Sequence, residues 1–211
     1  LVSTVPVRLR IFAVDLTDHK ELMDFQCTLE ERAPRCQMAD QSAGFGKIGP
    51  VGSLNLADEA GMVDLNCKAL CVVTHMVLPY LSGNSRIIQL ASSAAFLPQP
   101  DFAIYAATKS FVLSYSRALN EELKPRGIYV TAVCPGPVKT EFFDIAETTG
   151  EIPVYKRIVM ADPKRVVKKA IRDNMMGRTV SVYGITMKAF RLLCKMMPHR
   201  LLLAVMSFMN D

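Results

Sequence analysis

Short runs of β-branched and apolar residues alternate along the chain with longer segments in which apolar residues recur every three or four positions. The short runs predict strands, and the longer segments predict amphipathic helices. Strands are expected over residues 7–14, 86–91, 128–133 and 179–182, with a weaker candidate at 36–41. Helices are expected over about 18–32, 57–81, 105–124 and 163–174, followed by a helical region that is broken at Pro198.

This alternation of strands and helices predicts parallel βαβ units, with helices covering both faces of one sheet. A length of 211 residues fits a single α/β domain over residues 1–211, with 184–211 as a helical lid or packing segment. Ligands of such sheets bind beyond the carboxyl ends of the strands. Several unusual residues follow the predicted strand ends: Asp15, Gly44, Ser93, Pro135 and Gly136.

The composition supports a packed globular core, since 50% of the residues are hydrophobic and 21% are charged. The net charge of +5 is a mild excess, and its Lys and Arg residues are spread along the chain. A nucleic-acid site usually concentrates basic charge in a recognisable motif. We therefore expect no nucleic-acid partner, and the basic surface suits an anionic cofactor or substrate.

Six cysteines and three histidines form neither a C-x-x-C pair nor a zinc-binding pattern. Cys67 and Cys71 are four residues apart in a helical stretch, where two thiols can meet a metal, but apolar packing is favoured. Free thiols suit a reducing, cytoplasmic setting. We expect no signal peptide, and no continuous apolar run reaches the roughly 18–20 residues of a membrane span.

The first candidate for chemistry is Tyr105, which is followed four residues later by Lys109 on the same predicted helix. Residues at this spacing share a helix face. A nearby ammonium group favours the phenolate and lowers the pKa of a phenol from about 10. A phenol with a lowered pKa can exchange a proton near neutral pH. A surface cation–π or packing pair would show the same spacing.

Two serines, Ser92 and Ser93, follow the predicted strand 86–91 and precede the helix that carries Tyr105. A hydroxyl at this strand end lies at the mouth of the sheet, where it can donate a hydrogen bond to a substrate oxygen. The alternative interpretation is a serine that caps a helix or stabilises a turn.

Asn66 lies in the middle of the predicted helix 57–81, although asparagine is a poor helix former. Its position is explained either by a functional role or by simple exposure to solvent. Farther along, Pro135-Gly136-Pro137 follows the strand 128–133 and leads to Thr140.

In order and spacing, these residues resemble the Asn-Ser-Tyr-Lys tetrad and the Pro-Gly motif of the classical short-chain dehydrogenase/reductase family. Ala43-Gly44 resembles the turn after the family's fourth strand, and Asp15 resembles the acidic residue after its third strand. The resemblance extends to about residue 182. It implies a Rossmann-type, doubly wound parallel sheet.

The resemblance also implies a role for each residue of the tetrad. Tyr105 would be the general acid/base, and Ser93 would orient the substrate oxygen and stabilise its developing charge. Lys109 would lower the pKa of the tyrosine and hold the nicotinamide ribose. Asn66 would help to hold a water that links Lys109 to solvent, and Thr140 would contact the nicotinamide carboxamide.

The implied activity is hydride transfer between a nicotinamide cofactor and a carbonyl or secondary alcohol, without a metal. The cofactor is NADP or NAD, of which we favour NADP. The implied cofactor contacts are Asp15, Ala43, Gly44, Tyr105, Lys109, Pro135, Gly136 and Thr140. The long helices 57–81 and 105–124 resemble those through which family members pair, which implies a homodimer or homotetramer.

The sequence departs from the family pattern at its beginning. The family's Thr-Gly-x-x-x-Gly-x-Gly motif, which holds the pyrophosphate at a helix N-terminus, has no match here. Gly44-Phe45-Gly46-Lys47-Ile48-Gly49 fits a G-x-G-x-x-G string but lies downstream of the expected fourth strand. We therefore expect that the first two strands and their helices are missing, and that this chain alone binds dinucleotide poorly. The alternative is a non-catalytic binding or assembly module of the same fold.

A smaller departure concerns the serines, because the loop after Ser93 is one residue shorter than the family's commonest pattern. This leaves a choice between Ser92 and Ser93 for the residue that faces the substrate, and we favour Ser93.

Residues 184–209 carry apolar residues at helical spacing with Lys and Arg between them. Packing on the core or on another subunit is the default interpretation, followed by a lid over the substrate. An amphipathic contact with a membrane surface is the least favoured of the three. Because methionine-rich surfaces adapt to varied apolar partners, we lean towards a lipophilic carbonyl or alcohol substrate.

Overall fold

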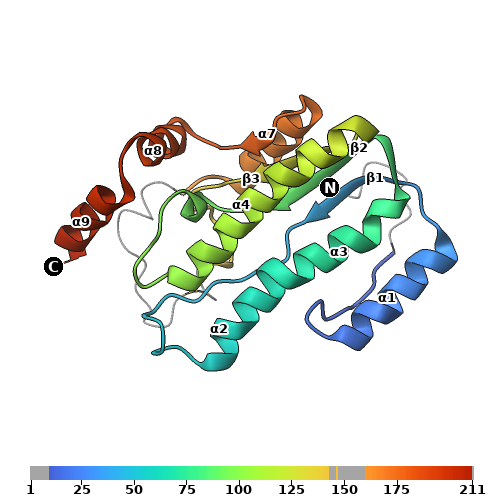
Figure 1. Ribbon diagram of the computed structural model, residues 1–211, viewed down its shortest axis with the longest axis horizontal. Helices are drawn as coiled ribbons and strands as arrows, with labels where there is room; N and C mark the ends of the chain where they lie inside the picture. Colours follow the sequence, from blue (N-terminus) through green and yellow to red (C-terminus); the bar gives the residue numbers. More distant parts are fainter. Residues whose placement is uncertain (1–9, 143–145, 147–159, 211) are drawn as a thin grey trace.

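The computed structural model describes residues 10–142, 146 and 160–210, and the side chains up to residue 204. Its centre is a four-stranded parallel sheet (Figure 1). The strands are β1 (Cys36–Gln41), β2 (Leu81–Leu90), β3 (Tyr129–Val133) and β4 (Val180–Ser181). They lie side by side in the order β1-β2-β3-β4, with each neighbouring pair parallel.

Helices cover both faces of this sheet. On one face, Ile87 of β2 and Val130 of β3 pack against Leu119 and Leu123 of α4 (Ala103–Leu123). On the other face, Ile88 of β2 and Val133 of β3 pack against Val166 and Ala170 of α7 (Pro163–Met175). Successive side chains of a strand point to opposite faces, so each apolar run contributes to two cores. The predicted doubly wound α/β class is confirmed.

A long helix lies beside α4 on the first face (Figure 1). It consists of α2 (Leu56–Val63), the π-helical segment η2 (Asp64–Ala69), α3 (Leu70–Val77) and the 3-10 turn η3 (Leu78–Tyr80). Its 25 residues are long and apolar enough to cross a membrane by length and composition alone, which the sequence analysis did not expect. It contacts α4 and β1, as a core helix of the domain does.

Two predicted strands differ from the structure. Residues 10–14 of the strand expected at 7–14 adopt no regular structure, and Ile11 in this segment is 83% exposed. A strand needs a hydrogen-bonded neighbour, and in the described part of the chain β1 pairs only with β2. Conversely, β2 begins at Leu81, five residues before the predicted start at residue 86. It includes Gly83 and Asn84, which were expected to form a turn. Asn84 has a φ of 70°, and the pairing register with β1 shifts in this part of the strand.

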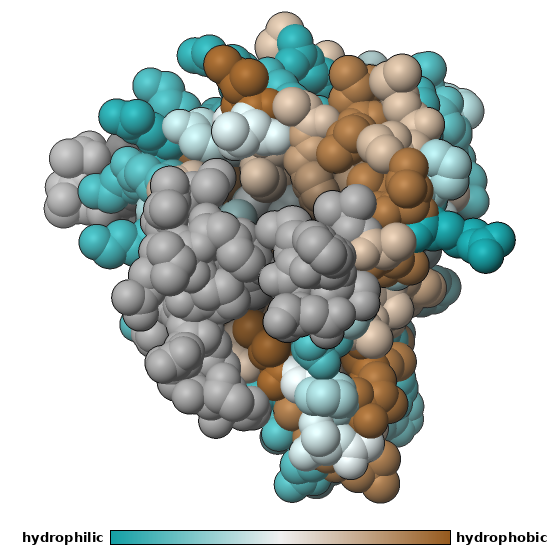
Figure 2. All heavy atoms as spheres, turned by 90° about the vertical axis from the view of Figure 1, so that its left-hand side faces the viewer, coloured by the Kyte–Doolittle hydropathy of each residue, from teal (hydrophilic) through white to brown (hydrophobic). Residues whose placement is uncertain are grey.

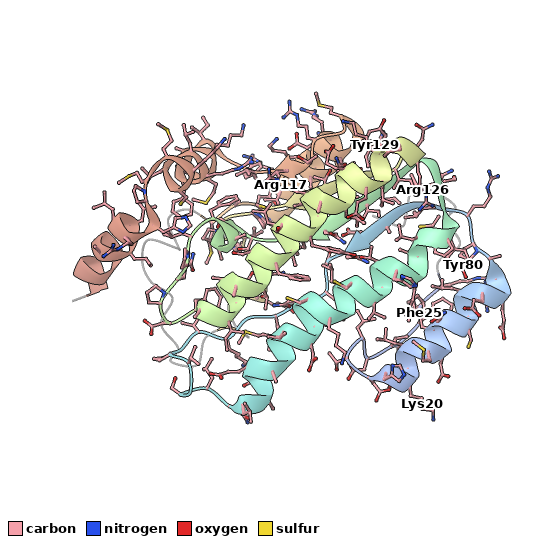
Figure 3. The ribbon with its side chains drawn as sticks, viewed as in Figure 1. Lys20, Phe25, Tyr80, Arg117, Arg126 and Tyr129 are labelled. Carbon is pink, nitrogen blue, oxygen red and sulfur yellow. The ribbon has the colours of Figure 1, made fainter. Side chains whose placement is uncertain are left out.

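Helix α1 (His19–Arg32) begins where the sequence predicts, because the Asp18 side chain accepts a hydrogen bond from the backbone N–H of Glu21. It contacts α3. Lys20 and Phe25 of α1 and Tyr80 of η3 mark one end of the molecule in Figure 3. The C-terminal helices α8 (Ile185–Met196) and α9 (His199–Asn210) lie at the other end (Figure 1).

Candidate active site

The predicted site residues gather where the first three strands end. Ala43 and Gly44 follow β1, the two serines follow β2, and Pro135 and Gly136 follow β3. The backbone N–H of Ser93 donates a hydrogen bond of 2.8 Å to the carbonyl of Pro135, which ties the ends of β2 and β3 together. This edge is where an open parallel sheet binds its ligand.

Tyr105 and Lys109 lie one turn apart on α4, and both side chains are buried, with exposed fractions of 7% and 4%. Lys109 Nζ lies 5.6 Å from the centroid of the Tyr105 ring. The same nitrogen donates a hydrogen bond of 2.8 Å to the carbonyl of Leu90, the last residue of β2. The helix therefore fixes the pair on one face, as the spacing predicts, and the strand end orients the ammonium group.

Burial dominates the protonation of both groups. It raises the pKa of Tyr105 to about 12, against a smaller lowering by a hydrogen bond with the side chain of Ser92. It also lowers the pKa of Lys109 to about 8. The sequence predicted a tyrosine pKa lowered by Lys109. In the structure the loss of solvation determines the direction of the shift instead. The ring centroids of Phe102 and Phe142 lie 4.3 and 5.4 Å from that of Tyr105.

The structure places Ser92, rather than Ser93, next to the phenol. The Ser92 side chain hydrogen-bonds Tyr105, and its Oγ accepts the backbone N–H of Ala94 at 3.1 Å. Ser93 instead begins the 3-10 turn η4 (Ser93–Phe96). This contact favours Ser92 over Ser93 as the serine that faces the substrate. The loop that is one residue too short when counted from Ser93 has the expected length when counted from Ser92.

Asn66 lies in the π-helical segment η2 and is 1% exposed, so it is not a solvent-facing residue. Its side chain accepts the N–H of Phe45 at 3.1 Å and donates to the Phe45 carbonyl at 2.8 Å. It also donates to Thr108 Oγ1 at 3.1 Å. Short π-helical segments frequently occur at functional sites. Here the segment points the amide at the loop after β1.

Two glycines of that loop lie against the tetrad. A Cβ at Gly44 would lie 2.7 Å from Asn66 Oδ1 and 3.3 Å from Lys109 Nζ. A Cβ at Gly46 would lie 2.6 Å from Cδ2 of Tyr105. Neither position has room for a side chain. Gly46 was not predicted as a site residue, although it belongs to the G-x-G string at 44–46.

Three other residues around the tetrad were not predicted. Thr108 occupies the position before Lys109, and its hydroxyl donates to the carbonyl of Tyr105 at 2.8 Å. Phe102 and Phe142 pack on the tyrosine ring. Thr108 stands inside the Tyr-x-x-x-Lys motif and could have been noticed there. The two phenylalanines carry no signal in the sequence.

Two predicted cofactor contacts lie in local turns. Asp15 accepts hydrogen bonds from the backbone N–H and the hydroxyl of Thr17 at 2.8 and 2.7 Å, which lower the pKa of its carboxyl group. Because residues 10–14 form no strand, Asp15 does not stand at a strand end beside β1, which corrects that expectation. Thr140 is exposed, and its Oγ1 accepts the N–H of Phe142 at 3.4 Å.

The site fits the nicotinamide half of a dinucleotide better than the adenine half. Lys109 carries three donors, of which the structure assigns one to Leu90, and Gly44 presents bare backbone beside it. These groups can hold a ribose diol. For the adenine and pyrophosphate, the described residues offer no glycine-rich turn at a strand end before β1, and Asp15 is engaged with Thr17.

Comparisons with known proteins concern the family and the fold of the chain. A family model described as short chain dehydrogenase matches residues 2–149. Sulfoacetaldehyde reductase 2 of Chromohalobacter salexigens is 34% identical over 140 residues, which are 64% of this chain and 56% of that protein. The very-long-chain 3-oxoacyl-CoA reductase of Mus musculus is 36% identical over 107 residues, which are 50% of this chain and 34% of that protein. The chain thus spans between a third and somewhat more than half of these relatives.

Solved structures share the fold. A short-chain dehydrogenase from Sphingobium yanoikuyae in complex with NADPH superimposes with a TM-score of 0.68 and 26% identity, over 94% of this chain and 74% of that one. A short-chain dehydrogenase from Streptomyces avermitilis superimposes with a TM-score of 0.74 and 23% identity, over 90% and 76% of the two chains. From the family match and the arrangement of the tetrad together, the chain belongs to the short-chain dehydrogenase family.

Proposed function

We propose that the protein is an NAD(P)-dependent oxidoreductase that transfers hydride between a nicotinamide cofactor and a carbonyl or secondary alcohol substrate. The observation that carries this proposal is the burial of Tyr105 and Lys109 together at the carboxyl edge of the sheet, with Ser92 on the phenol and Asn66 close by. Burying a lysine destabilises a fold, because burial disfavours its charged form. Buried ionisable groups of this kind are typical of sites that transfer protons.

In the proposed reduction, Tyr105 donates its phenolic proton to the substrate oxygen as the carbonyl carbon is reduced. A bound nicotinamide would supply the hydride. The Ser92 hydroxyl, which already contacts the phenol, gives the same oxygen a second donor and stabilises its negative charge. The Lys109 ammonium favours the phenolate that remains. A phenol pKa of about 12 keeps Tyr105 protonated at neutral pH, which suits a proton donor.

For the cofactor, we propose that Lys109 holds the nicotinamide ribose, that the loops with Gly44 and with Pro135 and Gly136 line its site, and that Thr140 contacts the carboxamide. We favour NADP over NAD, in keeping with the NADPH bound to the Sphingobium yanoikuyae enzyme.

For the substrate, we propose a lipophilic carbonyl compound or alcohol. The tyrosine belongs to a cluster of apolar side chains that includes Phe102, Phe142, Ile48 and Leu54. Such surroundings disfavour a charged group beside the reacting carbon. Both relatives described above are named as reductases, and the mouse protein is named for a very-long-chain 3-oxoacyl compound.

Calorimetric titration of the protein with NADPH and with NADH tests this function. We expect micromolar binding of one dinucleotide, tighter for NADPH, by the chain when a glycine-rich βαβ segment precedes it, and weak binding by these 211 residues alone. The binding protein should consume the reduced cofactor when medium-chain aliphatic ketones or aldehydes are added, and its Ser93→Ala variant should do so at the wild-type rate. Failure of both proteins to bind either dinucleotide would contradict the proposal and favour the non-catalytic module.

A further inference from the structure

Helix α8 has a broad apolar face, with an inner stripe and an outer stripe joined by Leu193, which is 44% exposed. The inner stripe packs on the domain. Met187 joins the core beneath α4 and would contact any side chain at Gly136, and Phe190 packs on Phe96 with ring centroids 6.4 Å apart. Cys194 and Met197 complete this stripe. The packing interpretation of the segment therefore accounts for one side of the helix only.

The outer stripe points into solvent. Ile185, Leu192 and Met196 are 85%, 57% and 75% exposed, and Ala189 between them is also exposed. These positions recur every three or four residues, so they form one continuous line along the helix. In the described part of the chain no element covers them. Packing within the domain does not explain why they are apolar.

The charge around this stripe is of one sign. Lys188, Arg191 and Lys195 are exposed beside it, and Arg200 follows in α9. Neither α8, α9 nor the neighbouring turn η4 contains an Asp or Glu residue. Figure 2 views the molecule from this end, with hydrophilic residues mainly on its left-hand side and hydrophobic residues mainly on its right-hand side.

From the apolar stripe and the basic residues along one side of it, we propose that α8 docks the protein on the surface of an anionic lipid bilayer. Ile185, Leu192 and Met196 enter the boundary between headgroups and acyl chains, and the flanking Lys and Arg side chains contact the lipid phosphates. A second copy of the chain is a poorer occupant, because a two-fold contact through α8 would bring like charges together.

Docking through α8 would also place the bilayer near the catalytic edge. The inner stripe of the same helix contacts Gly136 and Phe96, which belong to the segments that flank the tetrad. If the proposed function holds, a lipophilic substrate would reach the site from the membrane. The docking itself does not depend on that function.

Vesicle sedimentation tests the proposal. The purified protein is mixed with vesicles of equimolar phosphatidylserine and phosphatidylcholine, and with vesicles of phosphatidylcholine alone. We expect binding to the anionic vesicles that weakens as salt is added. The triple variant Ile185→Ser, Leu192→Ser, Met196→Ser should bind about ten-fold or more weakly, and Lys188→Gln and Lys195→Gln should each weaken binding about five-fold.

Helix α7 also carries an exposed apolar row beside basic residues, so it is the competing docking surface. It differs from α8 in the exposed carboxylate of Asp162 at its start, which pairs with Arg165. The triple variant Val167→Ser, Ile171→Ser, Met175→Ser removes the same number of exposed side chains and should bind like the wild type. The proposal is overturned by equal binding to both kinds of vesicle, or by an α8 variant that binds as well as the wild type. It is also overturned if the α8 variant loses an oligomer in light scattering while the wild type ignores vesicles.

Discussion

Ser92 and Ser93 are adjacent in the chain and differ in what they touch. The Ser92 side chain hydrogen-bonds the phenol of Tyr105, whereas the backbone of Ser93 bonds the carbonyl of Pro135. Ser92→Ala should lower kcat about a hundred-fold, because a donor to the developing charge is lost. Ser93→Ala keeps its backbone bond and should retain nearly full activity. Steady-state kinetics of the two variants test this assignment. A larger loss of kcat in Ser93→Ala than in Ser92→Ala would identify Ser93 as the catalytic serine.

The buried charge of Lys109 should cost the protein stability. Its pKa of about 8 lies below that of an exposed lysine, because burial disfavours the charged form. Between about pH 8 and about pH 10, the unfolded chain therefore binds more protons at Lys109 than the folded chain does. The loss of stability from burying the charge is complete below this range and absent above it. Lys109→Met should raise the free energy of unfolding by about 1–2 kcal/mol at neutral pH.

Urea unfolding at neutral pH and at about pH 10 measures this effect. The gain should shrink at the higher pH, while the variant binds dinucleotide weakly at both. A variant that is less stable than the wild type at neutral pH would show that the hydrogen bond to Leu90 outweighs the cost of burial.

At the scale of elements, polar side chains at the C-terminal end of α7 form hydrogen bonds with β2, β3 and β4. Asp173, which is 2% exposed, pairs with Lys169 at 2.6 Å and Arg178 at 3.2 Å and accepts the hydroxyl of Ser181 in β4. Asn174 donates to the Ile87 carbonyl of β2 and to a threonine of β3. These bonds hold the helix against the sheet whose ends carry the site.

Asp173→Asn should destabilise the protein by about 2 kcal/mol at neutral pH, because it removes the charge that two cations share. Desolvation raises the pKa of Asp173, but the bonds from Lys169 and Ser181 and the nearby cations together lower it. The contribution is therefore present above about pH 4 and lost as pH falls below it. Urea midpoints of both proteins should converge in acid. A constant difference from neutral pH to about pH 3 would contradict this account.

The sequence predicts most elements because their patterns are local. The helices at 105–124 and 163–174 and the strand at 128–133 occur within a few residues of their predicted bounds. The strand at 7–14 fails in its described part because a strand depends on a neighbour that no local pattern reveals. The tetrad could be predicted from spacing. The aromatic packing on Tyr105 could not, because Phe102 and Phe142 meet only through the tertiary fold.

At the scale of the whole molecule, the long helices are the surfaces through which we propose that copies pair. Val63 in α2 and Phe111 in α4 are 48% and 43% exposed. Phe111→Asp would place a charge in such a contact and should convert a dimer or tetramer to a monomer in light scattering. A particle mass that does not change with this substitution would place the contact elsewhere or leave the protein monomeric.

The two edges of the sheet differ in what surrounds them. At one edge β4 is two residues long and adjoins the helical C-terminal region, while at the other β1 leaves one side unpaired in the described part of the chain. An open edge of six residues can pair with another strand. The tetrad belongs to the middle of the sheet, so its geometry is held by β2 and β3 rather than by either edge.

The central claim, that Tyr105 is the proton donor of a nicotinamide-dependent oxidoreductase, is tested most directly by the turnover of Tyr105→Phe. The substitution removes the hydroxyl and keeps the ring that packs on Phe102 and Phe142. With dinucleotide binding and the urea midpoint unchanged, the rate of ketone reduction should fall about a thousand-fold. Reduction at the wild-type rate by a folded, cofactor-binding Tyr105→Phe protein would contradict the assignment.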